Sequence, residues 1–201
     1  MVKVCVLVSG GGTNLKALID AAARGELPSA ALALVVSNKP DAYALTRAKD
    51  AGIPTLVINN RDYADRESFD AALLEAMRQY EIEFVVCAGF LRIFSSVFTD
   101  AYPNRIINIH PSLLPSFGGK GFYGLHVHRA ALDYGVKVTG ATVFLVNEIT
   151  DGGKILLQKA VDVCDNDTPE ILQQRVMEQA EQVILPQATE LCCKKLLDGR
   201  G

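Results

Sequence analysis

The stretch that decides the fold is VKVCVLVSGGGTN at residues 2–14, in which a short apolar run leads directly into three glycines. An unbroken run of valine, leucine and cysteine is typical of a parallel strand that is buried on both faces. A glycine-rich turn after such a strand commonly opens a helix that packs back onto the sheet. The stretch therefore predicts the first strand and the first helix of an α/β domain.

The same alternation continues along the chain. Apolar runs predict strands at Val2–Ser9, Ala31–Ser37, Pro54–Ile58, Phe84–Ala88 and Ile106–His110, and helical patterns lie at Asn14–Arg24, Asp41–Ala51 and Asp65–Tyr80. Two later strand-like runs, Lys137–Val146 and Lys154–Val163, are separated by so short a connection that they predict an antiparallel pair. Thr168 and Pro169 then form the cap and first position of a long terminal helix. We expect an α/β fold, Rossmann-like, with an open twisted sheet of about seven mostly parallel strands and helices on both faces.

Composition limits the possible functions. The 201 residues suit a single domain, and the formal charge of −3 without a basic stripe argues against a nucleic-acid partner. No apolar run approaches the roughly 20 residues of a membrane helix, so no membrane contact is expected. The five cysteines make an odd count without a metal-like spacing, which indicates a reducing compartment and predicts a cytoplasmic location.

The glycine turn predicts an anion site. In Ser9–Asn14 the backbone amides and the positive end of the following helix would face a phosphate. Leu15 occupies the third glycine position of the dinucleotide fingerprint, and Ser37–Lys39 lacks its carboxylate, so a dinucleotide is not expected. A turn that only packs the helix onto the sheet is the alternative.

Two polar residues stand at the end of the fifth predicted strand. Asn108 and His110 are two residues apart, so both side chains project from the same face, and Pro111 ends the pairing of the strand. An amide beside an imidazolium can donate hydrogen bonds to the oxyanion formed when a nucleophile attacks a carbonyl carbon. A structural histidine is the alternative. His126 and His128 do not share a face in their helical pattern, so no metal site is expected.

An aspartate lies in the connection between the two late strands. Asp151 precedes Gly152 and Gly153, a context in which aspartate is most often only a turn former. If the fold brought Asp151 beside His110, its charge would favour the protonated imidazolium. The glycine-rich segment Pro115–Gly124 is expected to be a mobile surface loop.

Four motifs together resemble a known family, the folate-dependent glycinamide ribonucleotide formyltransferases of purine biosynthesis. They are SGGGTN at 9–14, AGFLRI at 88–93, NIHPSLLP at 108–115 and DGG at 151–153. The resemblance covers essentially the whole chain and implies the formyltransferase fold. It also implies transfer of the formyl group of 10-formyltetrahydrofolate to the amine of 5′-phosphoribosylglycinamide, without a metal.

The resemblance also assigns roles to residues of this chain. It implies a catalytic set of Asn108, His110 and Asp151, a substrate-phosphate set of Gly12, Thr13 and Asn14, and a folate set of Arg66, Leu91, Arg92, Ile93, Phe94 and Asn108. Glu181 is the expected counterpart of an acid in the terminal helix, with its register left open. Residues 1–201 would form one formyltransferase domain, with a phosphate-binding half at about 1–105 and a catalytic and folate half at about 106–201. The expected partners are small molecules, and the expected state is a monomer or a weak homodimer.

Two other enzymes and one noncatalytic protein are rival functions for this sequence. A formyltetrahydrofolate hydrolase would carry an extra amino-terminal domain, and a methionyl-tRNA formyltransferase an extra carboxy-terminal one, and neither is expected in a chain of this length. The acidic balance further disfavours tRNA. A noncatalytic nucleotide-binding regulator would use the glycine turn alone and leave Asn108 and His110 as structural residues.

Overall fold

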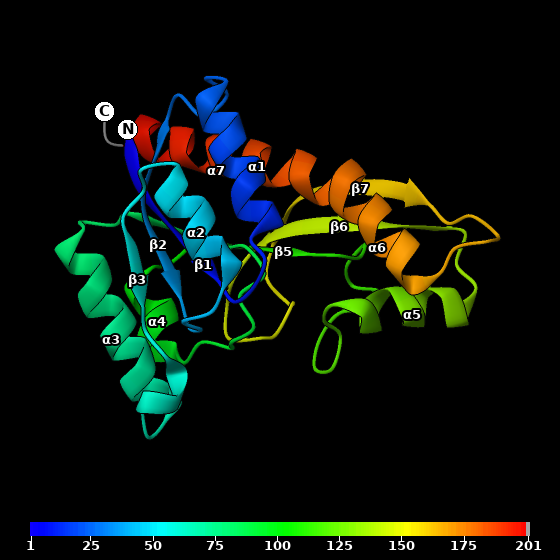
Figure 1. Ribbon diagram of the computed structural model, residues 1–201, viewed down its shortest axis with the longest axis horizontal. Helices are drawn as coiled ribbons and strands as arrows, with labels where there is room; N and C mark the ends of the chain where they lie inside the picture. The colour runs from blue at the N-terminus through cyan, green and yellow to red at the C-terminus, as the bar shows by residue number, and fades with distance from the viewer. Residues whose placement is uncertain (200–201) are drawn as a thin grey trace.

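The computed structural model describes residues 1–199 and contains one seven-stranded sheet with the order β3-β2-β1-β4-β5-β6-β7 (Figure 1). The strands are β1 (Val2–Val8), β2 (Ala30–Ser37), β3 (Thr55–Val57), β4 (Phe84–Cys87), β5 (Ile106–His110), β6 (Val138–Leu145) and β7 (Ile155–Asp162). Strands β1 to β5 pair in parallel, whereas β6 is antiparallel to both β5 and β7. The predicted mostly parallel sheet with a late antiparallel pair is confirmed.

Helices cover both faces of the sheet. They are α1 (Thr13–Ala23), α2 (Tyr43–Asp50), α3 (Arg66–Gln79), α4 (Ser96–Ala101), α5 (Leu125–Tyr134), α6 (Pro169–Val176) and α7 (Gln182–Asp198), with a 3₁₀ turn at Asn60–Asp62 and a π-helical turn at Met177–Glu181. In Figure 1, α3 and α4 lie together on one side of the sheet, and α7 runs beside α1 on the other. No helix within residues 1–199 combines the length and the apolar character needed to cross a membrane.

The core consists of two apolar layers divided by the sheet. On β1, Val4 and Val6 pack into the layer beneath α1 and α7, whereas Cys5 and Leu7 pack into the layer beneath α3 and α4. Successive side chains of a strand point to opposite faces, so a strand buried on both faces must be apolar throughout. This is the physical basis of the unbroken apolar run that opens the chain.

The terminal helix differs from its prediction. Thr168 Oγ1 accepts a hydrogen bond from the Ile171 amide and Pro169 is the first helical residue, so the predicted start is confirmed. The long helix that follows is divided into α6 and α7 by a π-helical turn, which was not predicted. Single π-helical turns inside α-helices are rare and are frequently found at functional sites. The short helix α4 was also not predicted.

The topology creates a crevice at the carboxyl ends of the central strands. The chain moves outward from β1 to β2 and β3, then returns to place β4 on the other side of β1. Ligands of open α/β sheets bind outside the carboxyl ends of the strands at such a reversal. The glycine turn after β1 and the segment after β4 meet here, where the Leu91 amide donates to Ser9 Oγ at 2.9 Å.

Candidate active site

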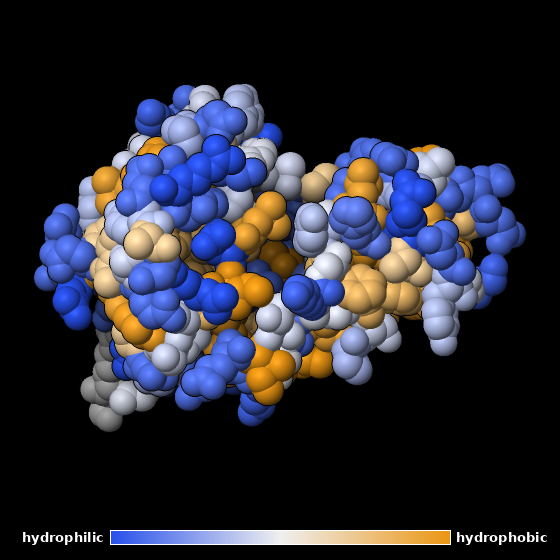
Figure 2. Space-filling view, turned by 90° about the horizontal axis from the view of Figure 1, so that it is seen from below, coloured by the Kyte–Doolittle hydropathy of each residue, from blue (hydrophilic) through white to orange (hydrophobic). Residues whose placement is uncertain are grey.

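A cleft of about 690 Å³ opens at the carboxyl ends of β1, β4 and β5. This volume lies within the usual range for small-molecule sites. Figure 2, which views the molecule from below relative to Figure 1, shows a hollow with hydrophobic side chains inside it. The cleft is lined by Thr13 and Asn14, by Gly89 to Ile93, by Asn108 to Pro111, by Gly119 to Gly124 with His128, by Thr150 and Asp151, and by Gln173, Met177 and Glu181.

Strand β5 delivers two polar side chains to this cleft. Asn108 and His110 both line it, as expected from their spacing of two residues. The strand is paired on both sides, since Asn108 lies opposite Cys87 of β4 and Phe144 of β6. His110 is only 4% exposed. A strand held on both edges positions these side chains more rigidly than a loop could.

The connection between β6 and β7 brings Asp151 to His110. The Oδ2 atom of Asp151 lies 3.6 Å from Nδ1 of His110, and the two side chains are 12% and 5% exposed. Gly153 makes this fold of the connection possible, because a Cβ at that position would lie 1.6 Å from the Leu145 carbonyl oxygen. The proximity that the sequence could not establish is therefore present in the structure.

The segment Pro115–Gly124 also reaches the site. The Phe117 carbonyl oxygen lies 2.8 Å from Nε2 of His110, and the Gly119 amide donates to Asp151 Oδ2 at 2.8 Å. The half-buried Phe117 side chain packs against the core. This half of the segment is thus anchored, unlike the mobile surface loop that its glycines predicted. The sequence does not predict the contact with His110, because it is made by a backbone carbonyl group, which every residue has.

The glycine turn presents free backbone amides. Gly12 precedes α1 in the left-handed conformation (φ 72°), and no side chain caps the first turn of that helix. A Cβ at Gly12 would lie 2.6 Å from Cβ of Ala44, so glycine is required where the turn approaches α2. Thr13 and Asn14 line the cleft directly behind it. Uncapped amides at a helix amino terminus favour an anionic ligand.

Gly12→Ala should therefore reduce both stability and binding at this turn. Left-handed strain and overpacking together are expected to lower the free energy of unfolding by about 2 to 5 kcal/mol. Gly25→Ala is the matched control, because Gly25 has a similar φ of 74° but open space around its Cβ position. Denaturant unfolding should show a smaller loss in the control, and equal losses would contradict the close-approach argument.

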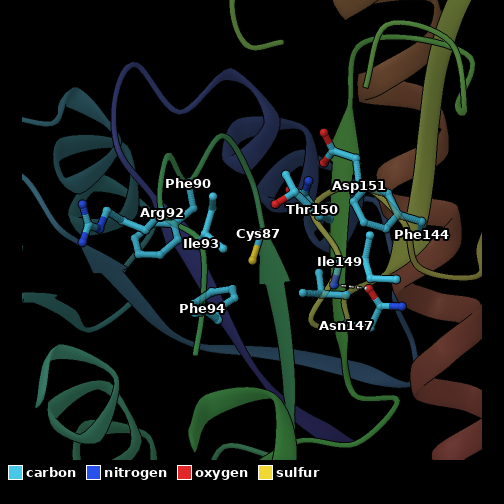
Figure 3. A pocket seen from close by; sticks show the side chains of 12 residues that line it. Cys87, Phe90, Arg92, Ile93, Phe94, Phe144, Asn147, Ile149, Thr150 and Asp151 are labelled. Atoms are coloured by element: carbon cyan, nitrogen blue, oxygen red, sulfur yellow. Dashed lines mark hydrogen bonds between the residues drawn. The ribbon is translucent and has the colours of Figure 1, made fainter. Parts of the chain in front are cut away.

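An aromatic stack supports the segment after β4. The Phe94 ring lies 5.7 Å from that of Phe90 and 4.4 Å from that of Phe98. Between these anchors Leu91 and Ile93 are 57% and 49% exposed. A second cavity of about 70 Å³ continues from here, with Cys87, Phe90 and Phe94 on one side and Thr150 and Asp151 on the other (Figure 3). Exposed apolar side chains beside a cavity are suited to a flat aromatic ligand.

The two arginines of the expected folate set differ in position. Arg92 lines both cavities, its guanidinium lies 5.8 Å from the centre of the Phe69 ring, and its buried Nε has no hydrogen-bond partner. Arg66 is exposed at the start of α3 and lines neither cavity. A contact between Arg66 and a ligand would involve a part that extends beyond these cavities.

Glu181 reaches the cleft from the terminal helix. Asn14 Nδ2 donates to Glu181 Oε2 at 2.7 Å, and burial raises the pKa of this glutamate. Gln173, Met177 and Glu181 all line the cleft, although each step of four residues in an α-helix overshoots one turn by about 40°. The wider π-helical turn offsets this drift and keeps Glu181 facing the cleft. Each of these three residues directly follows a buried residue of the terminal helix. This regular spacing along the helix is a sequence pattern that could have indicated them.

The remaining histidines do not form a cluster. His126 is exposed, whereas His128 is 1% exposed and burial lowers its pKa to about 4, so its ring is neutral at neutral pH. Both of its ring nitrogens lack a partner. In the part of the chain that the structure describes, no group of three or more His, Cys, Asp or Glu side chains could hold a metal ion.

Comparisons with known proteins agree with this geometry. The sequence profile described as formyl transferase matches residues 2–189. The chain is 39% identical to a phosphoribosylglycinamide formyltransferase of Haemophilus influenzae, covering 91% of this chain and 84% of that protein. Its structure superposes on that of glycinamide ribonucleotide transformylase 1 from Symbiobacterium toebii with a TM-score of 0.91 and 42% identity, covering 97% and 89% of the two chains.

Some relatives are much longer than this chain. It spans 66% of a chloroplastic phosphoribosylglycinamide formyltransferase of Arabidopsis thaliana at 39% identity. It spans 18% of the trifunctional purine biosynthetic protein adenosine-3 of Gallus gallus at 45% identity. The family expected from the motifs is confirmed: the chain belongs to the formyl transferase family, among the phosphoribosylglycinamide formyltransferases.

Proposed function

We propose that the chain transfers the formyl group of 10-formyltetrahydrofolate to the amine of 5′-phosphoribosylglycinamide. The products are formylglycinamide ribonucleotide and tetrahydrofolate, as in purine biosynthesis. The observation that carries this proposal is the convergence of Asn108, His110 and Asp151 in one cleft. An anion-binding turn lies on one side of these residues, and an exposed apolar segment lies on the other.

The reaction requires one bond exchange and one proton transfer. The amine lone pair attacks the formyl carbon, and the carbonyl electrons move onto oxygen. The bond from carbon to N10 of the folate then breaks with its electron pair, and N10 gains the proton that the amine loses. The protein must therefore stabilise an oxyanion and move a proton over a short distance.

The three polar residues fit these two tasks. The Asn108 amide can donate to the oxyanion, and a protonated His110 can donate beside it. Asp151 faces the His110 ring at 3.6 Å, and its carboxylate stabilises the positive charge that the ring carries during proton transfer. The low exposure of His110 strengthens both electrostatic effects by excluding water.

The two sides of the cleft suggest how the substrates divide it. The phosphate of the acceptor would bind the amides of Gly12 to Asn14, with Glu181 positioned to accept hydrogen bonds from its hydroxyl groups. The folate would lie along Leu91 to Phe94 and enter the smaller cavity, with Arg66 near its outer end. Both halves of the domain would therefore contribute to both substrates, since Leu91 to Phe94 belong to the phosphate-binding half and Glu181 to the catalytic half.

Glu181→Gln is expected to raise the KM for the acceptor by about 10- to 100-fold with little change in kcat. Loss of a hydrogen bond to a charged group weakens ground-state and transition-state binding alike. Glu178→Gln is the matched control, since Glu178 lies in the same helical turn but is exposed. Steady-state kinetics with varied acceptor measure the effect, and a fall in kcat at unchanged KM would contradict this role.

The decisive assay measures formyl transfer with each substrate omitted in turn. Transfer from 10-formyltetrahydrofolate should depend on the acceptor amine and persist after treatment with a chelator. A hydrolase would release formate without the amine, and a noncatalytic regulator would bind the acceptor without turnover.

We also propose a cytoplasmic location, supported by the free thiols of all five cysteines. Size-exclusion chromatography should show a monomer or a weak homodimer.

A further inference from the structure

We infer that the backbone of Phe117–Gly119 is a positioning element that holds the His110 proton on Nε2 and leaves Nδ1 as the nitrogen that serves the reaction. The assignment of the proton rests on geometry alone. Its catalytic consequence rests on the proposed function. The inference also gives a role to the anchored half of the Pro115–Gly124 segment.

The two nitrogens of His110 have different neighbours. Nε2 lies 2.8 Å from the Phe117 carbonyl oxygen, which can only accept a hydrogen bond, so Nε2 must be the donor. Nδ1 lies 3.6 Å from Asp151 Oδ2, too far for a direct hydrogen bond. In histidine sites, the hydrogen bond of one ring nitrogen determines the state of the other. Nδ1 of the neutral ring therefore carries the lone pair.

Phe117 adopts an unusual backbone conformation to make this contact. Its φ of 53° is in the left-handed region, which bulky residues rarely occupy. Strained residues of this kind persist where the surrounding structure holds them, and they gather at functional sites. Because φ and ψ set the direction of a carbonyl group, the contact with His110 depends on this conformation.

A buried network of hydrogen bonds holds residues 112–116, the segment that precedes Phe117. Ser112 Oγ donates to the Ser116 carbonyl at 2.6 Å, and Thr142 Oγ1 donates to the Ser112 carbonyl at 2.7 Å. Gln158 of β7 donates to the Leu114 carbonyl at 2.9 Å. Thr142 also lies opposite His110 in the sheet. Strand β6 thus contributes to the position of both the segment and the histidine.

Gly118 and Gly119, which follow Phe117, help to position Asp151 beside His110. The Gly119 amide donates to Asp151 Oδ2 at 2.8 Å, the same oxygen that faces His110. A Cβ at Gly118 would lie 2.4 Å from Leu114 Cδ2 and 3.4 Å from Asp151 Cβ, so the segment passes close to the aspartate. Three consecutive residues therefore position both His110 and Asp151.

The reaction would then use the Nδ1 face of the ring. The Nε2 proton stays with the Phe117 carbonyl, while Nδ1 takes up the proton and passes it on. Once protonated, Nδ1 is the donor that faces both Asp151 and the reacting atoms. A ring in the other tautomer would place its lone pair against the Phe117 carbonyl oxygen and lose this arrangement.

Two substitutions at Phe117 separate backbone geometry from side-chain packing. Glycine adopts a φ of 53° freely but removes the packing, whereas valine keeps apolar contact but strongly resists that conformation. We expect kcat to fall by about 10- to 100-fold in Phe117→Val, as for loss of other groups that orient a histidine, and to fall by less in Phe117→Gly. Phe117→Asn should resemble glycine, because asparagine tolerates the left-handed region. A larger loss in glycine than in valine would overturn the inference.

A spectroscopic test needs no substrate. In ¹⁵N-labelled protein at alkaline pH, the His110 spectrum should show the directly bonded proton on Nε2, and Phe117→Val should shift the population toward Nδ1. The chain has three histidines, so spectra of His126 and His128 variants would assign the signals. A wild-type ring with its proton on Nδ1 would overturn the inference. Because the tautomer is read without turnover, a failure of formyl transfer would count against the proposed function instead.

Discussion

Asp151→Asn should leave the fold intact and lower kcat by about 10²- to 10⁴-fold, the usual contribution of a positioned proton-transfer group. The loss has an electrostatic cause, because the amide cannot stabilise a positive ring at the position where Oδ2 lies 3.6 Å from Nδ1. Asparagine also accepts the left-handed φ of 54° at this position. The folded structure should therefore survive the substitution.

Kinetics and a stability measurement distinguish this effect from misfolding. Asp165→Asn is the matched control, because its side chain is 92% exposed in the turn after β7. Single-turnover rates and thermal unfolding should be measured for both variants. His110→Ala should reach a similar rate to Asp151→Asn, and the double variant should lose little more, since residues that act as a unit are not additive. A rate within about tenfold of the unmodified chain would reject the proton-handling role.

Asn108→Ala is expected to lower kcat by about 10²- to 10³-fold, the usual cost of removing one oxyanion donor. The KM of both substrates should change less, because the donor acts mainly on charge that develops in the transition state. Asn108→Asp tests the same idea with nearly unchanged shape. An ionised carboxylate would repel the oxyanion, so its rate should be no higher than that of the alanine variant.

Asn166→Ala serves as the control for this pair of variants, because Asn166 is exposed in the turn before α6. Binding of a folate analogue by titration calorimetry should be retained in Asn108→Ala. A variant that binds the analogue normally but loses turnover has lost transition-state stabilisation. A proportional loss of folate affinity with unchanged kcat would instead assign Asn108 to substrate binding alone.

Much of the fold could be predicted from local patterns. The five parallel strands are short apolar runs, and each appears within a few residues of its predicted bounds. The helix predicted at Asp65–Tyr80 is present as α3, and its residues Phe69, Leu73 and Met77 are buried, because a helix must bury its apolar face. The pairing of Asn108 with His110 was predictable because the side-chain period of a strand is two.

The rest of the site depends on contacts between distant segments. Asp151 is an ordinary turn residue in its local sequence, and only the antiparallel return of β6 and β7 carries it to His110. The π-helical turn determines that Glu181 faces the cleft, so the sequence alone left open which residue of the terminal helix does so. Phe117 contributes a carbonyl group, so its side chain carried no signal of that contact.

By itself the sequence determined the α/β class, the glycine turn after β1 and the two polar residues at the tip of β5. These features follow from periodicity and from the conformations that glycine and proline allow, which act over a few neighbouring residues. Only the tertiary structure decided which carboxylate faces the His110 ring, which carbonyl group faces Nε2 and where the terminal helix meets the cleft. Such contacts depend on the relative placement of whole elements, which is a property of the packed core rather than of any local pattern.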